Sequence, residues 1–243
     1  EGTNYLDFLS EEEYFDIIKQ ADSIRYSAVI FLYFIVHSFK NQNGVQENRE
    51  DHNQKEGPRD FWQILANGGV GAICSIIFLI SGSPFWFFPY LASICEATAD
   101  TWATEIGTLS PIKPISIVTL KNIATGQSGG VTILGILASA AGSGVTMLVS
   151  YLILSFSGHH SAVSLPLWLG AANAGFAGSL MDSILGGSIQ GQYECQICGQ
   201  LIERHSHCGV PTRTKHGYRG INNDMVNLIS TLFSALMISL MLI

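Results

Sequence analysis

The chain has 243 residues, of which 47% are hydrophobic and 13% are charged, and its formal net charge is −7. Soluble globular domains usually contain about 25% charged residues, so this composition argues against an ordinary soluble domain. It indicates instead an all-α, polytopic bundle in the lipid bilayer, for which we expect no nucleic-acid partner.

The first 25 residues are acidic and lack the basic region with which a signal peptide begins. Ser10 and Glu13 have the spacing of a helix-capping box, and apolar residues recur around them at helical intervals. The sequence therefore predicts an acidic amphipathic segment over residues 1–25, followed by a membrane domain over residues 26–243.

Six apolar segments follow, and most have the roughly 20 residues that a helix needs to cross a bilayer core. The first of them is shorter and is a marginal span. The predicted spans are residues 26–39, 64–82, 84–107, 130–156, 165–187 and 225–243.

Six spans would place the loops 40–60, 109–128 and 191–223 on one side of the membrane, and these loops hold ten of the twelve Lys and Arg residues. Cytosolic loops of membrane proteins are enriched in Lys and Arg. We therefore expect them to face the cytosol or a plastid stroma, in an endomembrane or a plastid membrane, with the C-terminus on the opposite side.

Five carboxylates lie within or beside the predicted spans, namely Glu96, Asp100, Glu105, Asp182 and Asp224. A charge at mid-bilayer costs roughly 3 kcal/mol, so these groups are expected to face protein, water or a cation. On a helix, Glu96, Asp100 and Thr104 fall within about 80° of one another. Glu105 lies about 100° further round, unless the helix unwinds there.

Clustered carboxylates are hard oxygen ligands of the kind that holds Mg²⁺ together with a phosphate-bearing substrate. We expect Glu96, Asp100, Glu105 and Asp182 to bind Mg²⁺. Two alternatives use the same acids: hydrogen bonds that hold helices together, and a pathway for protons or ions. Amides on other segments add polarity to the predicted site, at Asn67, Asn223 and Asn227.

A glycine-rich turn, within "LKNIATGQSGGVTILG", leads into a long apolar segment. Such backbone presents free N–H groups at a helix N-terminus, which suits a phosphate, and Lys121 adds a cation. Taken alone, the pattern is more often a closely packed turn; beside the acids, phosphate binding is the better interpretation. The residues concerned are Gly126, Ser128, Gly129 and Gly130.

Two further features carry a candidate role. Arg59 shares a helix face with Asn67 and either contacts substrate or anchors the segment at the membrane interface. The loop "CQICGQLIERHSHC" has Cys-x₂-Cys followed by His and Cys, which is half of a zinc-ribbon pattern. It predicts a structural zinc site, with a set of reduced thiols as the alternative; the expected ligands are Cys195, Cys198, His205 and Cys208.

Several of these segments together resemble a known family. "RDFWQILANGG", "EATADTWATEIG", "PISIVTLKNIATGQSGGVTILG", "GSLMDSILGGSIQ" and "INNDMVNLIS" are similar to the motif series of the transmembrane protein 19 family, also known as domain of unknown function 92. The resemblance runs from residue 59 to residue 243. Family members usually carry additional apolar segments before the one at residues 26–39, where this sequence departs from the pattern.

Plant members of this family are phytyl-phosphate kinases. The resemblance implies Mg²⁺-dependent transfer of phosphate from a nucleoside triphosphate, with CTP a favoured donor, to an isoprenoid monophosphate such as phytyl phosphate. The expected catalytic residues are Asp100, Glu105, Lys121, Asp182 and Asp224. The expected substrate-binding residues are Arg59, Asn67, Gly126, Ser128, Gly129, Gly130, Asn223 and Asn227.

An isoprenoid tail is expected to lie between helices, where small residues such as Gly175 and Gly178 leave room. The competing function is an ion-coupled transporter that uses the same intramembrane acids. Many transporters contain inverted repeats, and the two halves of this chain show no convincing duplication.

Overall fold

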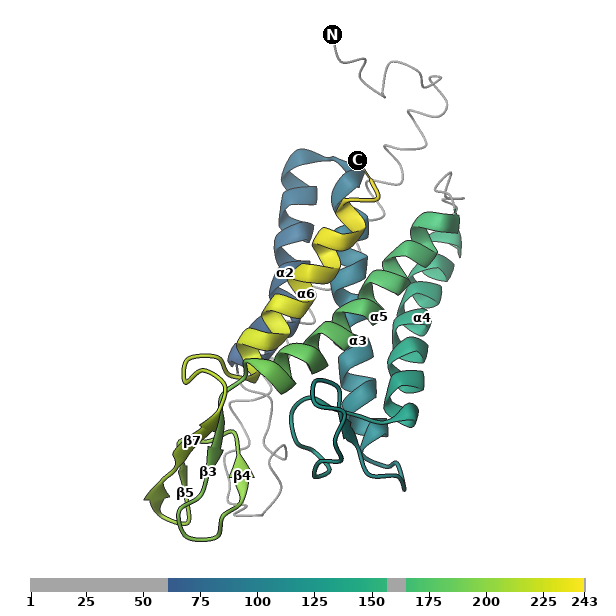
Figure 1. Cartoon of the computed structure of the whole chain (residues 1–243). Coiled ribbons are helices and arrows are strands. Elements are labelled where there is room, and N and C mark those ends of the chain that lie inside the picture. The colour runs from purple at the N-terminus through teal and green to yellow at the C-terminus, as the bar shows by residue number, and fades with distance from the viewer. Residues whose placement is uncertain (1–60, 157–164, 243) are drawn as a thin grey trace, which may run out of the picture.

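The computed structural model describes residues 61–156 and 165–242, and this part of the chain is mostly helical (Figure 1). Five of the six predicted spans coincide with helices. The segments 1–25, 26–39 and 40–60, with Arg59, lie outside the described residues. The helices are α2 (Phe61–Ser81), a short 3₁₀ helix η2 (Pro84–Trp86), α3 (Phe87–Gly107), α4 (Ile133–Phe156), α5 (Leu165–Ser188) and α6 (Asn223–Ser239).

Of the described helices, α2 and α4 are long and apolar enough to cross a membrane, judged by length and composition. The other three are less apolar or shorter: α3 contains Glu96, Asp100 and Glu105, and α6 has 17 residues. A count of six membrane spans therefore stays a prediction.

Local sequence explains where α4 and α6 begin. Asn222 has an extended backbone, and its side chain accepts a hydrogen bond from the amide of Met225 at 3.0 Å, which caps α6. Asp224 occupies the first turn of α6, where a negative charge suits the helix dipole. Thr132 caps α4 in the same way, since its hydroxyl accepts from the amide of Gly135 at 3.0 Å.

Helix α3 lies at the centre of the bundle. It contacts each of the other four helices, and α2, α6, α5 and α4 form an arc around it in that order (Figure 1). The aromatic core lies where α3, α4 and α5 meet, because the buried ring of Trp168 packs edge-on against Phe87, Phe88 and Tyr151. Helix α3 therefore places Glu96 and Asp100 inside the bundle, whereas Glu105 is exposed.

Two glycines of α5 allow the helices to approach closely. A Cβ atom on Gly175 would lie 2.5 Å from the Cβ of Cys95, and one on Gly178 would lie 2.6 Å from the Cγ of Glu96. The prediction that Gly175 and Gly178 leave room for an isoprenoid tail is therefore wrong. Residues of α3, and at Gly178 also residues of α6, fill that space, as in the small-residue interfaces of membrane helices.

The expectation of an all-α chain also needs correction, because short strands form in the loops. Strands β1 (Ile115–Ser116) and β2 (Gly130–Val131) pair antiparallel and close the loop that holds the glycine-rich turn. Five more strands form a module within the loop 191–223, with a three-stranded sheet in the order β4-β3-β7 and a hairpin of β5 and β6. These are β3 (Gln192–Glu194), β4 (Leu201–Ile202), β5 (Ser206–His207), β6 (Val210–Pro211) and β7 (Arg213–His216).

Both loops lie at one end of the bundle, and the C-terminus lies at the other end (Figure 1). Their lysines and arginines, among them Lys113, Lys121, Arg213 and Lys215, are exposed. The loops 109–128 and 191–223 thus share one end of the bundle, while their placement on one side of the membrane, and the side that they face, stay predictions.

Candidate functional site

A polar pocket opens at the loop end of the bundle, between α3, α4, α5 and the glycine-rich turn. Its walls carry threonine, serine, glutamine and aspartate side chains, which suits a polar ligand. Seven of the predicted site residues line it: Asp100, Asp182, Gly126, Ser128, Gly129, Gly130 and Asn223.

Asp100 and Asp182 bring carboxylates into the pocket from α3 and α5. The hydroxyl of Ser230 donates to Oδ2 of Asp182 at 3.3 Å. Asn227 is buried, and in the amide orientation that satisfies its neighbours it donates to the same oxygen at 2.9 Å and accepts from Nδ2 of Asn67 at 3.2 Å. Asn67 and Asn227 thus link α2 and α6 to Asp182 instead of lining the pocket.

Glu96 lies one helical turn before Asp100 and is 1% exposed. Neither of its carboxylate oxygens has a hydrogen-bond partner among the described residues, and the group interacts electrostatically with Asp100 and Asp182. Burying an unpaired charge is costly, so a carboxyl group in this position is expected either to carry a proton or to have a cation beside it. Glu96 is therefore close enough to Asp100 and Asp182 to feel their charge, but it does not line the pocket.

Three predicted catalytic residues do not reach the pocket. Glu105 is exposed, because α3 stays helical as far as Gly107 and keeps this side chain off the face that carries Glu96 and Asp100. Lys121 is exposed on its loop, and Asp224 lies in the first turn of α6; neither lines the pocket.

The glycine-rich turn is seated on the end of α5. Gly129 has φ +79°, and a Cβ there would lie 2.3 Å from the Cα of Gly187, so only glycine fits. Gly126 has φ +81° with no neighbour within 4 Å of such an atom. Close packing thus explains Gly129, whereas Gly126 lies on the open side of the turn.

The N-terminus of α4 also reaches the pocket, since Thr132, Gly135 and Ile136 are part of its wall. The first amides of a helix and its dipole favour a bound anion. The pocket therefore has carboxylates from α3 and α5 on one part of its wall and anion-favouring backbone on another.

Three side chains that the sequence did not single out hold the turn in place, namely Gln190, Gln192 and Glu203. Gln190 is 1% exposed and donates from Nε2 to the Ser128 hydroxyl at 3.2 Å, and Ser128 donates to the Glu203 carboxylate. Gln127 also donates to Oε1 of Gln192 at 3.3 Å. The sequence did not identify these residues because glutamine and glutamate are common in loops and at helix ends, whatever their role.

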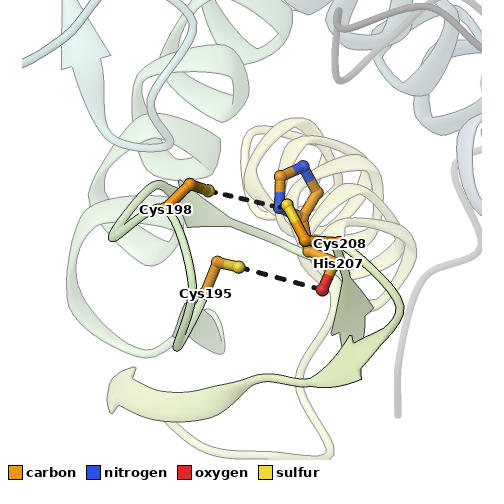
Figure 2. A group of neighbouring side chains, drawn as sticks. All are labelled: Cys195, Cys198, His207 and Cys208. Atoms are coloured by element: carbon orange, nitrogen blue, oxygen red, sulfur yellow. Dashed lines mark hydrogen bonds between the residues drawn. The ribbon is translucent and has the colours of Figure 1, made fainter.

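A second cluster lies in the β-module and consists of Cys195, Cys198, His207 and Cys208 (Figure 2). One ligand atom from each residue lies within 4.8 Å of those of all the others. Among the described residues, no other group of three or more His, Cys, Asp or Glu meets this criterion. The predicted fourth ligand, His205, is not a member, because its ring packs against Tyr193 at a centroid distance of 4.5 Å.

The thiol of Cys195 is held in an environment that favours its ionised form. Hydrogen bonds from the backbone amide of Cys198, from His207 and from the amide of Ile197 lower the pKa of Cys195 to about 6.

Residues 17–235 match the model of a family described as "Integral membrane protein DUF92". The chain belongs to this family. The match covers most of the sequence, including the pocket and the β-module, and it confirms the resemblance inferred from the motifs. Membership also identifies the chain as an integral membrane protein.

Three relatives of this DUF92 chain show how widely the family is distributed. Protein PGR of Arabidopsis thaliana is 29% identical over 89% of this chain and 81% of its own length. An uncharacterized membrane protein of Methanocaldococcus jannaschii is 28% identical over 86% of this chain and 72% of its own. The chloroplastic Protein VTE6 of Arabidopsis thaliana is 23% identical over 83% of this chain, which spans 51% of VTE6. No solved structure matches the chain.

Proposed function

We propose that this DUF92 protein is a membrane-bound prenyl-phosphate kinase. It transfers the terminal phosphate of a nucleoside triphosphate, CTP for preference, to an isoprenoid monophosphate such as phytyl phosphate, giving the diphosphate. The kinase class follows the family resemblance, and the chloroplastic location of one relative is consistent with a prenyl substrate.

A single observation carries the proposal. Asp100 and Asp182 share one open pocket with the glycine-rich turn and the N-terminus of α4. Carboxylates and an anion-favouring backbone in one cavity suit a ligand that is itself a complex of a polyanion with a divalent cation. In a pocket that binds an organic anion without a cation, two carboxylates would repel the ligand.

The donor set fits Mg²⁺. This ion prefers oxygen ligands, keeps several waters and is commonly held by one or two carboxylates together with substrate phosphates. Asp100 and Asp182 would supply those carboxylates, and hydroxyls such as those of Thr104 and Ser183 lie nearby on the wall. The bound ion would neutralise charge on the phosphates during transfer.

In the transfer step, an oxygen of the prenyl monophosphate attacks the γ-phosphorus of the nucleotide. The bond from that phosphorus to the β-phosphate oxygen breaks, and the nucleoside diphosphate leaves with its electron pair. Such reactions need mainly positioning and charge neutralisation. The positive end of the α4 dipole and the turn around Gly126 would orient phosphate oxygens, while Asn223 adds an amide at the pocket wall.

The test uses the purified protein in detergent with Mg²⁺, CTP radiolabelled at its γ-phosphate, and either phytyl phosphate or geranylgeranyl phosphate. Labelled prenyl diphosphate is detected by thin-layer chromatography. We expect product that disappears with EDTA and that falls on the order of 100-fold or more in both Asp100→Asn and Asp182→Asn. Absence of labelled diphosphate with either acceptor and with CTP, ATP or GTP would reject the proposal.

An ion-coupled transporter is the second candidate, and the buried carboxylate of Glu96 is the observation that favours it. Proton or cation relays use such groups. The protein in liposomes should then carry a pH-driven or Na⁺-driven flux that Glu96→Gln abolishes. The same variant keeps Asp100 and Asp182 in the pocket, so a kinase would retain CTP turnover that depends on Mg²⁺.

A further inference from the structure

The cysteine-rich β-module carries a second site, apart from the pocket and independent of the proposed kinase. Its two ligand pairs come from separate turns: Cys195 and Cys198 from the β3–β4 connection, and His207 and Cys208 from the β5–β6 hairpin. Figure 2 shows the three sulfur atoms and the imidazole directed toward a common centre.

The distances are those of a compact ligand set. Nδ1 of His207 lies 3.5 Å from Sγ of Cys198 and 3.2 Å from Sγ of Cys208. Around a tetrahedral zinc ion, with Zn–S of about 2.3 Å and Zn–N of about 2.0 Å, neighbouring ligand atoms are about 3.5 to 3.8 Å apart. Small adjustments of side-chain torsions therefore suffice to admit the ion.

The backbone conformation of both turns positions the sulfur and nitrogen atoms. The amide of Gly199 donates to the carbonyl of Cys195 at 3.0 Å, and the amide of Ile197 donates to Sγ of Cys195 at 3.4 Å. In the other turn, Cys208 has φ +52° and Gly209 has φ +74°, as in a tight two-residue hairpin. Asn or Gly normally occupies the first of these positions, so a cysteine in a left-handed conformation points to a role for its sulfur.

The module is also too small to hold itself together by apolar burial. Its buried apolar side chains are Tyr193, Cys195 and Ile202, and its strands have two to four residues each. Small units of this kind usually depend on disulfides or a metal. Any one disulfide among Cys195, Cys198 and Cys208 would leave the third thiol and the imidazole unused, whereas a metal uses all four groups.

We propose that Cys195, Cys198, His207 and Cys208 bind one structural Zn²⁺ ion. Three thiolates with one imidazole select zinc over magnesium or calcium, and a closed set of four ligands is typical of a structural site rather than a catalytic one. Zinc binding would be coupled to folding of the module.

The module has a consequence for the pocket, because it supplies partners to the glycine-rich turn. Glu203 accepts a hydrogen bond from Ser128, and Gln192 accepts one from Gln127. Both acceptors belong to strands or connections that the metal would hold in place. Zinc is therefore expected to order the turn from outside the bundle without contacting the substrate.

The first experiment measures zinc in the full-length protein, purified in detergent without an affinity tag that binds metal, by inductively coupled plasma mass spectrometry. We expect about one zinc ion per chain. Cys198→Ser and His207→Ala should each lower it at least about tenfold. His216→Ala, an exposed histidine of β7, is the matched control and should keep the ion, as should His205→Ala.

A second measurement does not depend on variants that fold. The wild-type protein is treated with a chelator and titrated with Co²⁺, which reports tetrahedral thiolate coordination by its visible and charge-transfer absorption. A tetrahedral spectrum that Zn²⁺ abolishes supports the site. Less than about a tenth of an ion per chain together with no such spectrum overturns it, and so does recovery of two of the cysteines as a disulfide.

The link to the pocket has its own readout, hydrogen exchange of the peptide containing residues 126–130. Removal of zinc should speed this exchange, while peptides from α2 should be unchanged. Equal exchange with and without zinc would overturn the link and leave the metal site standing. Neither result depends on whether the protein proves to be a kinase.

Discussion

Asn227 connects three helices through one buried side chain. It contacts Asp182 of α5 and Asn67 of α2 from its own position on α6. It does not line the pocket, so its predicted role in substrate binding gives way to a role in orienting Asp182. Partners of this kind commonly affect a metal site as much as some of the ligands do.

Replacing Asn227 by alanine removes the amide that orients the carboxylate of Asp182. We expect Asn227→Ala to raise the Mg²⁺ concentration for half-maximal activity by about 10-fold or more. The loss of interhelical hydrogen bonds should lower stability by about 1 kcal/mol. Metal titration of the CTP-dependent activity and thermal unfolding in detergent measure the two effects.

Asn173→Ala, at an exposed position of α5, is the matched control and should leave both quantities unchanged. If Asn227→Ala lowers stability without changing the Mg²⁺ requirement, Asn227 serves only to pack the helices.

Glu105 is a residue for which sequence and structure lead to different expectations, because the sequence predicted a metal ligand and the structure places the side chain off the pocket. Glu105→Gln should keep activity within about twofold of wild type, because the side chain is exposed and off the pocket. Asp100→Asn, on the face of the same helix that lines the pocket, should be nearly inactive. Equal, large losses in the two variants would mean that α3 unwinds near its end when substrate binds.

The sequence predicted the pocket acids but not every member of either site. Helical periodicity correctly grouped Glu96 with Asp100, and it also placed Glu105 off that face, although we still assigned it as a ligand. The predicted histidine, His205, lies away from the cysteine group because spacing alone does not give the register of a hairpin. The two-residue turn at Cys208 and Gly209 brings His207, not His205, beside the cysteines.

At the scale of elements, the contact between α5 and α3 depends on the absence of a side chain. A Cβ on Gly175 would lie 2.5 Å from the Cβ of Cys95 and 2.8 Å from the amide nitrogen of Glu96. Backbone atoms in a central helix cannot move aside as the end of a flexible side chain can. The two helices would have to separate.

We therefore expect Gly175→Ala to destabilise the protein by about 1 to 3 kcal/mol. Gly144→Ala on α4 is the control, since a Cβ there meets nothing within 4 Å and alanine favours the helix by about 1 kcal/mol. Thermal unfolding in detergent should show a lower midpoint for the first and an equal or higher one for the second. Equal midpoints would contradict the packing described for α5.

Long apolar segments made the helices predictable from the sequence. The strands could not be predicted in this way. Strands of two to four residues are too short to show alternation, and those of the β-module are specified by tight turns and by cysteine and glycine positions. The glycine-rich turn illustrates the remaining ambiguity. Its pattern is compatible with phosphate binding and with close packing, and Gly129 is used for packing.

For the whole molecule, the two ends of the bundle differ in charge and in accessibility. Exposed lysines and arginines gather on the two loops at one end, while α6 carries the C-terminus to the other. In sealed vesicles, we expect trypsin to cleave near Lys113 and Lys121 from the cytosolic face only. A C-terminal epitope should be digested from the opposite face only.

Immunoblots of right-side-out and inverted vesicles distinguish these outcomes, and detergent-treated vesicles give the control in which both sites are cut. Cleavage of the loop and of the epitope from the same face would contradict the predicted topology, because an even number of crossings would then separate them.

The hydrogen bonds around Ser128 come from two separate parts of the chain. One partner, Gln190, follows directly on α5 and belongs to the bundle, whereas the other, Glu203, belongs to the β-module. A gene that replaced residues 195–216 by a shorter connection would lose Glu203 and keep Gln190. Deletion of the module would therefore remove one of the two partners of Ser128 and leave the other in place.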